Sequence, residues 1–169
     1  MGTSTLKSTA ITNRDATIKA LTNAKLYGAP LQSAVGYATA AAADDTSSTY
    51  RLCALPSACI VRGVYLSSVA QGGSAAVDVG VRRATADGGA AISATATALF
   101  GSAVSLVSAI SRSDVTNEST NYTAALREQP LWQAAGLSAD PGGELDLTVV
   151  PTAALTNGGA IAVEVQFVM

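Results

Sequence analysis

Alternation of apolar with polar or small side chains is the sequence feature that most constrains the fold. It spans residues 75–83, 144–151 and 160–168. A period of two is that of a β-strand, because successive side chains point to opposite faces of a sheet. Each segment therefore predicts a strand with one buried face and one face toward solvent or a partner. The side chains predicted to face the core are Val77, Val79, Val81, Leu145, Leu147, Val149, Ile161, Val163, Val165 and Phe167.

Weaker sheet signals fill much of the remaining chain. The pattern predicts further strands over residues 33–40, 49–54 and 59–68, and weaker ones over 92–100 and 121–127. Pro130 and Gly136 bracket a short helical turn. The last two strands are predicted to form a hairpin, with Asn157 and Gly158 available for its turn.

Seven or eight short strands separated by turn signals indicate an all-β sandwich or barrel. A chain of 169 residues is one domain by its length. A domain of this size buries roughly 70% of its unfolded surface, so it needs no disulfide or metal to hold a core. We therefore expect one β domain over residues 34–169.

Residues 1–33 differ from the rest of the chain because they have no clean period. They hold four of the ten lysine and arginine residues. We expect an extended N-terminal arm with a short helical turn near residues 16–21. Such a segment is either a loose terminus or an arm that orders against a partner.

The composition excludes several classes of function. The chain has no histidine, which removes Ser-His-Asp and Cys-His catalysis and the commonest metal ligand. Its net charge of −2 provides no basic field for nucleic acid or an anionic membrane. The first residues lack a secretory pattern, Leu6 departs from the myristoylation pattern, and no long apolar run predicts a membrane span. Only 13% of residues are charged, which favours a surface that packs against other proteins.

Cys53 and Cys59 flank Pro56 between two predicted strands. A disulfide across the ends of the strands is one interpretation. Small buried thiols at a tight corner are the favoured one, since two cysteines without histidine make no metal site. Pro56 fixes φ and donates no ladder hydrogen bond, so it belongs in the connection.

The acidic residues Asp140, Glu144 and Asp146 surround a Pro-Gly-Gly turn. They allow a calcium site, although solvated turn residues are the favoured interpretation. A carboxylate pair for glycoside hydrolysis remains open, but the chain is poor in the aromatic side chains of carbohydrate sites. Trp132 is interpreted as a core residue rather than a ligand platform. We expect no enzyme, no cofactor and no metal.

Several longer stretches together resemble the capsid decoration (cement) proteins of tailed bacteriophages, which have a jelly-roll-like β-sandwich. The resemblance covers residues 11–168. The stretches that carry it are ITNRDAT (11–17), DDTSSTYRLCALPSACIVRGVYLSS (44–68), AAVDVGVRR (75–83), SDVTNES (113–119), QPLWQAAGLSADPGGELDLTVVPTAA (129–154) and AIAVEVQFV (160–168).

The resemblance implies an all-β, jelly-roll-like antiparallel β-sandwich with no catalytic motif. It further implies a virion protein on the outer surface of the capsid, over contacts between capsomers of an HK97-type major capsid protein. A dimer or a trimer is compatible with the sequence. We expect the arm to contact capsid subunits or a neighbouring copy through Ile11, Asn13, Arg14 and Asp15. The alternatives are a tail or head-fibre module that binds host glycan or protein and, more distantly, a carbohydrate enzyme.

Overall fold

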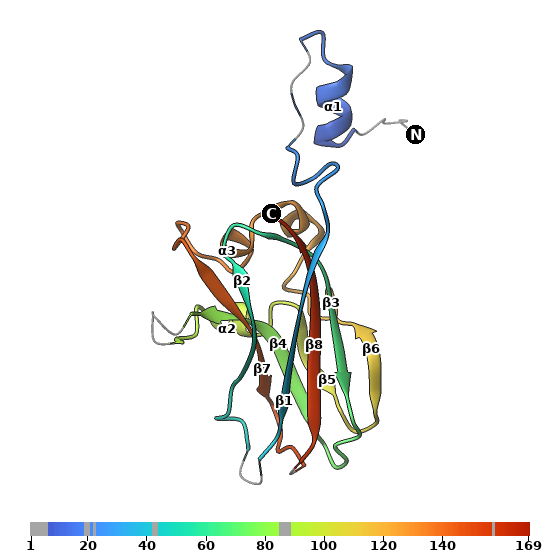
Figure 1. Ribbon diagram of the computed structural model, residues 1–169, viewed down its shortest axis with the longest axis vertical. Coiled ribbons are helices and arrows are strands. Elements are labelled where there is room, and N and C mark those ends of the chain that lie inside the picture. The colour runs from blue at the N-terminus through green and yellow to red at the C-terminus, as the bar shows by residue number, and fades with distance from the viewer. Residues whose placement is uncertain (1–6, 19–20, 22, 42–43, 85–88, 157) are drawn as a thin grey trace, which may run out of the picture. The chain divides into compact units, whose positions relative to one another are not determined.

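The structure is a computed structural model that describes residues 7–18, 21, 23–41, 44–84, 89–156 and 158–169. The chain divides into two compact units, Met1–Pro30 and Leu31–Met169. The second unit holds all the described strands (Figure 1).

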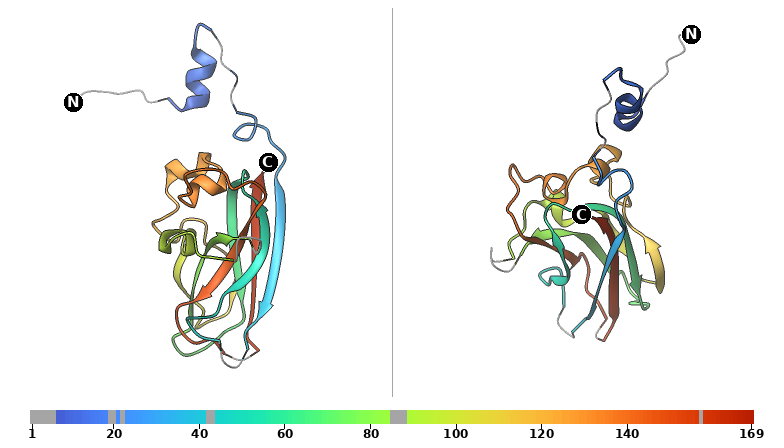
Figure 2. Two further views of the ribbon diagram at one scale, coloured as in Figure 1. Left: turned by 90° about the vertical axis from the view of Figure 1, so that its left-hand side faces the viewer. Right: turned by 45° about the horizontal axis from the view of Figure 1, so that its top comes forward.

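The second unit is an all-β sandwich of two four-stranded antiparallel sheets, which confirms the predicted fold class (Figures 1 and 2). The two sheets are named sheet I and sheet II, and the strands of each are given in the order in which they pair. Sheet I consists of β1 (Gln32–Thr39), β8 (Ala160–Val168), β3 (Ile60–Ser68) and β6 (Ile110–Asp114). Sheet II consists of β2 (Tyr50–Pro56), β7 (Glu144–Pro151), β4 (Ala76–Arg83) and β5 (Gly101–Ser105).

The core lies between the two sheets and is built from the alternating residues that the sequence singles out. The ten side chains predicted to face the core are all buried. Phe100 and Tyr122 meet edge to face there, with ring centroids 5.0 Å apart. Trp132 packs against this core, as expected, from the short helix α3 (Leu131–Ala134) that follows Pro130.

Strand β7 departs from the expected pattern of one buried and one wet face. Asp146 and Thr148 point away from the core, yet they are only 6% and 0% exposed. The reason is a second layer over sheet II, because the backbone of Ala96 and Thr97 lies against the outward position of Gly80 in β4. A Cβ at Gly80 would lie 2.1 Å from the Ala96 carbonyl oxygen, so the close approach depends on glycine.

Two predicted strands are wrong. Residues 92–100 contain α2 (Ala94–Thr97), which begins where Ser93 Oγ accepts a hydrogen bond from the Ala96 N–H. Residues 121–127 contribute instead to a 3-10 helix, η2 (Ala124–Glu128). Alanine favours a helix once a serine caps it, and this local effect outweighs a weak alternation. Strands β5 and β6 were not predicted, because both are short and largely exposed.

Strands β7 and β8 do not form the predicted hairpin, because they lie in different sheets. Residues 152–159 cross from one sheet to the other, with Gly158 at a φ of +78° and Asn157 outside the described residues. Strands β2 and β3 are likewise in different sheets, so residues 57–59 form a corner. Alternation predicts which side chains are buried, but it does not predict which sheet a strand joins.

The two sheets lie close together along the side where the edge strands β1 and β2 meet. A Cβ at Gly36 would lie 2.1 Å from the Leu52 carbonyl oxygen, so the two edge strands pack backbone to backbone. On the opposite side, the edge strands β5 and β6 each contain a non-glycine residue in the left-handed region. These residues are Ala103, with φ of 51°, and Arg112, with φ of 49°.

The first unit contains one described helix, α1 (Thr9–Asp15). Ser8 caps it, because its Oγ accepts a hydrogen bond from the Ile11 N–H at 3.3 Å. The helix ends at Ala16, which is extended. It therefore precedes the turn predicted near residues 16–21, part of which lies outside the described residues.

Candidate interaction surface

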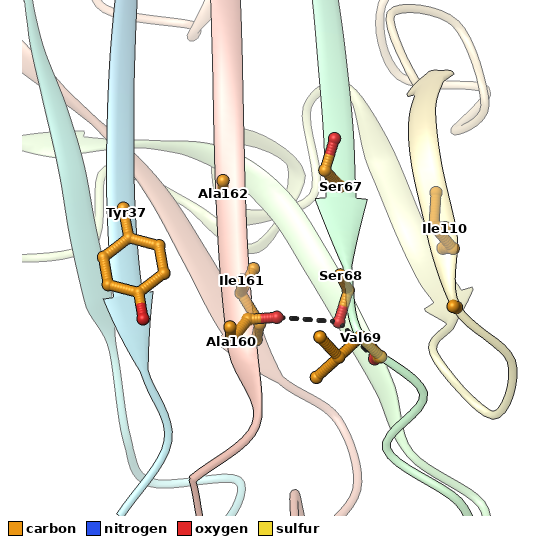
Figure 3. A pocket seen from close by; sticks show the side chains of 9 residues that line it. Tyr37, Ser67, Ser68, Val69, Ile110, Ala160, Ile161 and Ala162 are labelled. Carbon is orange, nitrogen blue, oxygen red and sulfur yellow. Dashed lines mark hydrogen bonds between the residues drawn. The ribbon is translucent and has the colours of Figure 1, made fainter.

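The outer face of sheet I carries a shallow hollow of about 310 Å³ (Figure 3). The register places Tyr37 of β1 opposite Ala162 of β8, and Ala162 opposite Ser67 of β3. Tyr37 and Val69 are 66% and 49% exposed. The hollow exists because the outward positions of β8 here are alanines, whose small side chains leave the larger neighbours standing above them.

The hollow is apolar apart from hydroxyl groups that already have partners. Ser68 Oγ donates to the backbone oxygens of Val69 and Ala160, at 2.8 and 3.2 Å. The Tyr37 hydroxyl lies 2.7 Å from Thr39 Oγ. None of the nine residues that line the hollow is charged. Such a surface is suited to burying an apolar side chain.

A fixed polar cluster adjoins the hollow on the same face. Arg112 donates from Nε and Nη2 to the two carboxylate oxygens of Glu164, each at 2.9 Å. Its guanidinium carbon lies 4.0 Å from the centroid of the Tyr65 ring. The Arg112 N–H donates to Ser67 Oγ at 2.9 Å, which helps to hold the backbone at its positive φ. The Arg112 guanidinium holds the pKa of Glu164 below its usual value.

The four arm residues proposed to bind a partner all lie in α1. Ile11 and Arg14 line a second hollow, of about 280 Å³, together with Ala10 and Tyr27. Asp15 accepts from Arg14 Nε and from Lys7 Nζ at 2.9 Å each, and these bonds lower its pKa. Asn13 is half-buried and is not part of that hollow.

The two cysteines are buried thiols, as the favoured interpretation had it. Burial raises the pKa of the Cys53 thiol, which makes it a poor nucleophile. The corner at residues 57–59 is fixed by backbone bonds from α3, in which the Leu131 N–H donates to the Cys59 oxygen and the Trp132 N–H to the Ser57 oxygen. Pro56 ends β2 instead of lying in the connection. The stretch is a packing corner.

The acidic residues considered for calcium do not converge. Asp140 accepts from Ser57 Oγ at 2.6 Å and from the Gly142 N–H at 2.9 Å. Asp146 forms an ion pair with Arg51. Within the described ranges, no group of three or more acidic, cysteine or histidine side chains is arranged to hold a metal. No helix among the described residues is long and apolar enough to cross a membrane.

Sequence reasoning missed the hollow on sheet I, although β1 carries a signal for it. In this strand the larger apolar residues Val35 and Tyr37 alternate with the small residues Ala34, Gly36 and Ala38. The small residues face inward and the large ones are exposed, by 70% for Val35 and 66% for Tyr37. Apolar side chains on the face opposite a row of small ones can indicate an outward contact surface.

The comparisons with known proteins identify a shared fold. No family model and no curated protein matches the sequence. Among solved structures, a chain of the cyanophage Pam1 capsid asymmetric unit superposes with a TM-score of 0.54 at 18% identity, covering 92% of this chain and 95% of that one. A chain of the acidic stable capsid structure of Helicobacter pylori bacteriophage KHP30 gives 0.41 at 16% identity, covering 83% and 94%.

Proposed function

We propose that this chain is a structural protein of a phage virion and that it acts as a decoration protein. In this proposal it binds the outside of an HK97-type capsid and bridges neighbouring capsomers. The observation that carries the proposal is the likeness to a chain of the Pam1 capsid asymmetric unit, which extends over nearly the whole length of both chains. A likeness of such extent favours a similar use of the whole domain.

The strand order supports this interpretation. The eight described strands are antiparallel and lie in two sheets of four, with the orders β1-β8-β3-β6 and β2-β7-β4-β5. We interpret this as a jelly roll, an architecture that recurs in viral capsid proteins. Fold alone does not specify function, so the surface must carry the rest of the argument.

The surface favours a binding role over catalysis. The described carboxylates with the clearest contacts, Asp44, Asp114 and Glu164, are engaged by Tyr50, Thr116 and Arg112. Each contact lowers the pKa of its carboxyl group, which opposes use as a general acid at neutral pH. The exposed apolar residues of sheet I provide instead a surface that gains from contact with protein.

Stabilisation of the shell follows from mass action. A protein that binds only the assembled shell shifts the equilibrium toward that shell. Many copies held together gain avidity beyond the affinity of one contact. In this proposal the sandwich associates as a dimer or trimer around a local symmetry axis, and Ile11, Asn13, Arg14 and Asp15 of the arm contact capsid subunits or a neighbouring copy.

The deciding experiment is quantitative mass spectrometry of purified particles of the phage that encodes this chain. We expect a copy number of the same order as that of the major capsid protein. A few copies per particle would favour a tail or head-fibre module that binds host glycan or protein. Complete absence from particles would overturn the assignment to the virion.

The arm is tested separately with full-length protein and purified capsids. Arg14→Glu reverses a charge on α1, where Arg14 is exposed. We expect it to weaken capsid binding by roughly tenfold or more, because avidity multiplies a modest loss per site. Gln133→Glu, an exposed position on α3, is the control and should bind as the wild type does. Equal binding by both variants would remove the arm from the proposal.

A further inference from the structure

We propose that the hollow on the outer face of sheet I receives the N-terminal arm of a second copy of this chain. The apolar side chains of the arm would fill the hollow beside Tyr37. The proposal rests on the proposed function in one respect only, since a virion holds many copies side by side. It names the contact that would join those copies.

The arm carries large apolar side chains that its own unit leaves uncovered. Ile18, Leu21 and Tyr27 are 88%, 98% and 78% exposed. Water-exposed side chains of this size on a short segment favour association with another apolar surface. These side chains can therefore supply apolar contacts to another surface.

The hollow has the complementary properties. Its floor is made of the small residues Ala160 and Ala162, and its walls include the exposed Tyr37 and Val69. Because none of the described residues in its lining is charged, an apolar side chain could enter without burying an unpaired charge. The neighbouring Arg112 and Glu164 already form an ion pair with each other, so an arm bound in the hollow would leave neither charge without a partner.

Charge favours the arm as the occupant of the hollow. Residues 1–33 contain four basic and one acidic side chain, so they carry +3. The whole chain carries −2, which leaves −5 on the remaining residues. The arm of one copy is therefore attracted to the sandwich of another, whereas two arms or two sandwiches repel each other. This asymmetry favours an exchange of arms over a face-to-face pairing of sandwiches.

The first test is photo-crosslinking of the full chain with benzoylphenylalanine in place of Tyr27. Unlabelled and ¹⁵N-labelled copies are mixed, and crosslinked peptides are mapped by mass spectrometry. We expect crosslinks to β1 or to residues 160–162, in peptide pairs that combine both isotopes. Pairs of one isotope only would mean that each arm folds onto its own sandwich. Crosslinks that map elsewhere would also overturn the proposal.

The second test measures self-association by sedimentation equilibrium. Tyr37→Lys replaces the apolar wall of the hollow with a positive charge that repels the basic arm, at an exposed position where folding should tolerate it. We expect this variant to self-associate at least about tenfold more weakly than the wild type, and we expect the association of the wild type to weaken in high salt. Gln133→Lys adds the same charge at an exposed position outside the hollow and should leave self-association unchanged. Equal behaviour of the two variants, or a wild type that stays monomeric, would overturn the proposal.

These results separate the inference from the proposed function. The copy number in virions tests whether the chain belongs to the capsid, and it does not depend on which surface receives the arm. A high copy number with no crosslink between copies would retain the virion protein and reject the exchange of arms. Crosslinks between copies of a protein absent from virions would do the reverse.

Discussion

The outer face of sheet II is covered by another layer of the chain, whereas the outer face of sheet I is exposed. Over sheet II, the backbone at Ala96 and Thr97 packs so closely that only glycine fits at position 80 of β4. Asp146 is buried there, beside its ion-pair partner Arg51. Over sheet I, by contrast, Tyr37 is 66% exposed.

This difference indicates that the outer faces of the two sheets have different roles. Sheet II uses its outer face to complete the domain, so changes there should reduce stability. Sheet I leaves apolar side chains uncovered, so changes there should affect association more than folding. The contrast supports sheet I as the contact surface. It can be tested by measuring the free energy of unfolding of variants on each face.

The largest effect is expected for Gly80→Ala. The new Cβ would lie 2.1 Å from the Ala96 oxygen, and a backbone atom cannot move away without lifting α2. We expect a loss of about 3 kcal/mol in the free energy of unfolding, measured by urea denaturation. Gly63→Ala is the counterpart on sheet I, where the Cβ would meet the Tyr65 ring at 2.9 Å. A side chain can yield, so its cost should be below about 1 kcal/mol. Equal costs would contradict the contrast.

The next effect concerns the buried carboxylate of sheet II. Asp146→Asn removes the charge that pairs with Arg51 while keeping the shape of the side chain. We expect a loss of about 2 kcal/mol, since Asp146 is largely shielded from water. Thermal and urea unfolding would measure it. Asp140→Asn, at an exposed turn position, serves as the control and should cost less.

The exposed ion pair of sheet I should have a smaller effect that depends on pH. Pairing with Arg112 holds the pKa of Glu164 below its usual value of 4.5. The pair therefore stabilises the fold above that value, and the stabilisation is lost as the pH falls through the lowered pKa. Urea midpoints of Glu164→Gln and the wild type should differ most near neutral pH and converge in acid. A difference that persists unchanged at low pH would exclude the ion pair as its cause.

The smallest effect is expected for Tyr37→Ser. The side chain is mostly in water, so the free energy of unfolding should change by less than about 0.5 kcal/mol. Tyr122→Phe provides the comparison, because the buried Tyr122 hydroxyl donates to the Val61 oxygen at 3.1 Å. That variant should lose about 1 kcal/mol. A large destabilisation by Tyr37→Ser would mean that the outer face of sheet I also supports the fold.

The fold class could be predicted from the sequence because burial between two sheets imposes a period of two. Val79, Leu147 and Val163 follow it in the central strands. The assignment of strands to sheets could not be predicted, because β7 and β8 show the same alternation although they pair with different partners. The edge strand β6 escaped prediction because it is too exposed to carry a pattern.

The candidate surface was predictable only in part. The low charge of the chain indicated contact with other proteins, but it did not indicate where. Arg112 and Glu164 are 52 residues apart in sequence and meet only because β3 lies between β6 and β8. Asp146 was expected on an open face because the second layer over sheet II comes from a segment predicted to be a strand.

The positive φ of Ala103 and Arg112 affects how copies of the chain can associate through the edges of the sheets. An open strand edge is a template on which like molecules add without limit, as in a fibril. A residue at positive φ in the middle of β5 and of β6 interrupts the row of donors and acceptors that such growth requires. Unlimited growth of a fibril through these two edges is thereby discouraged.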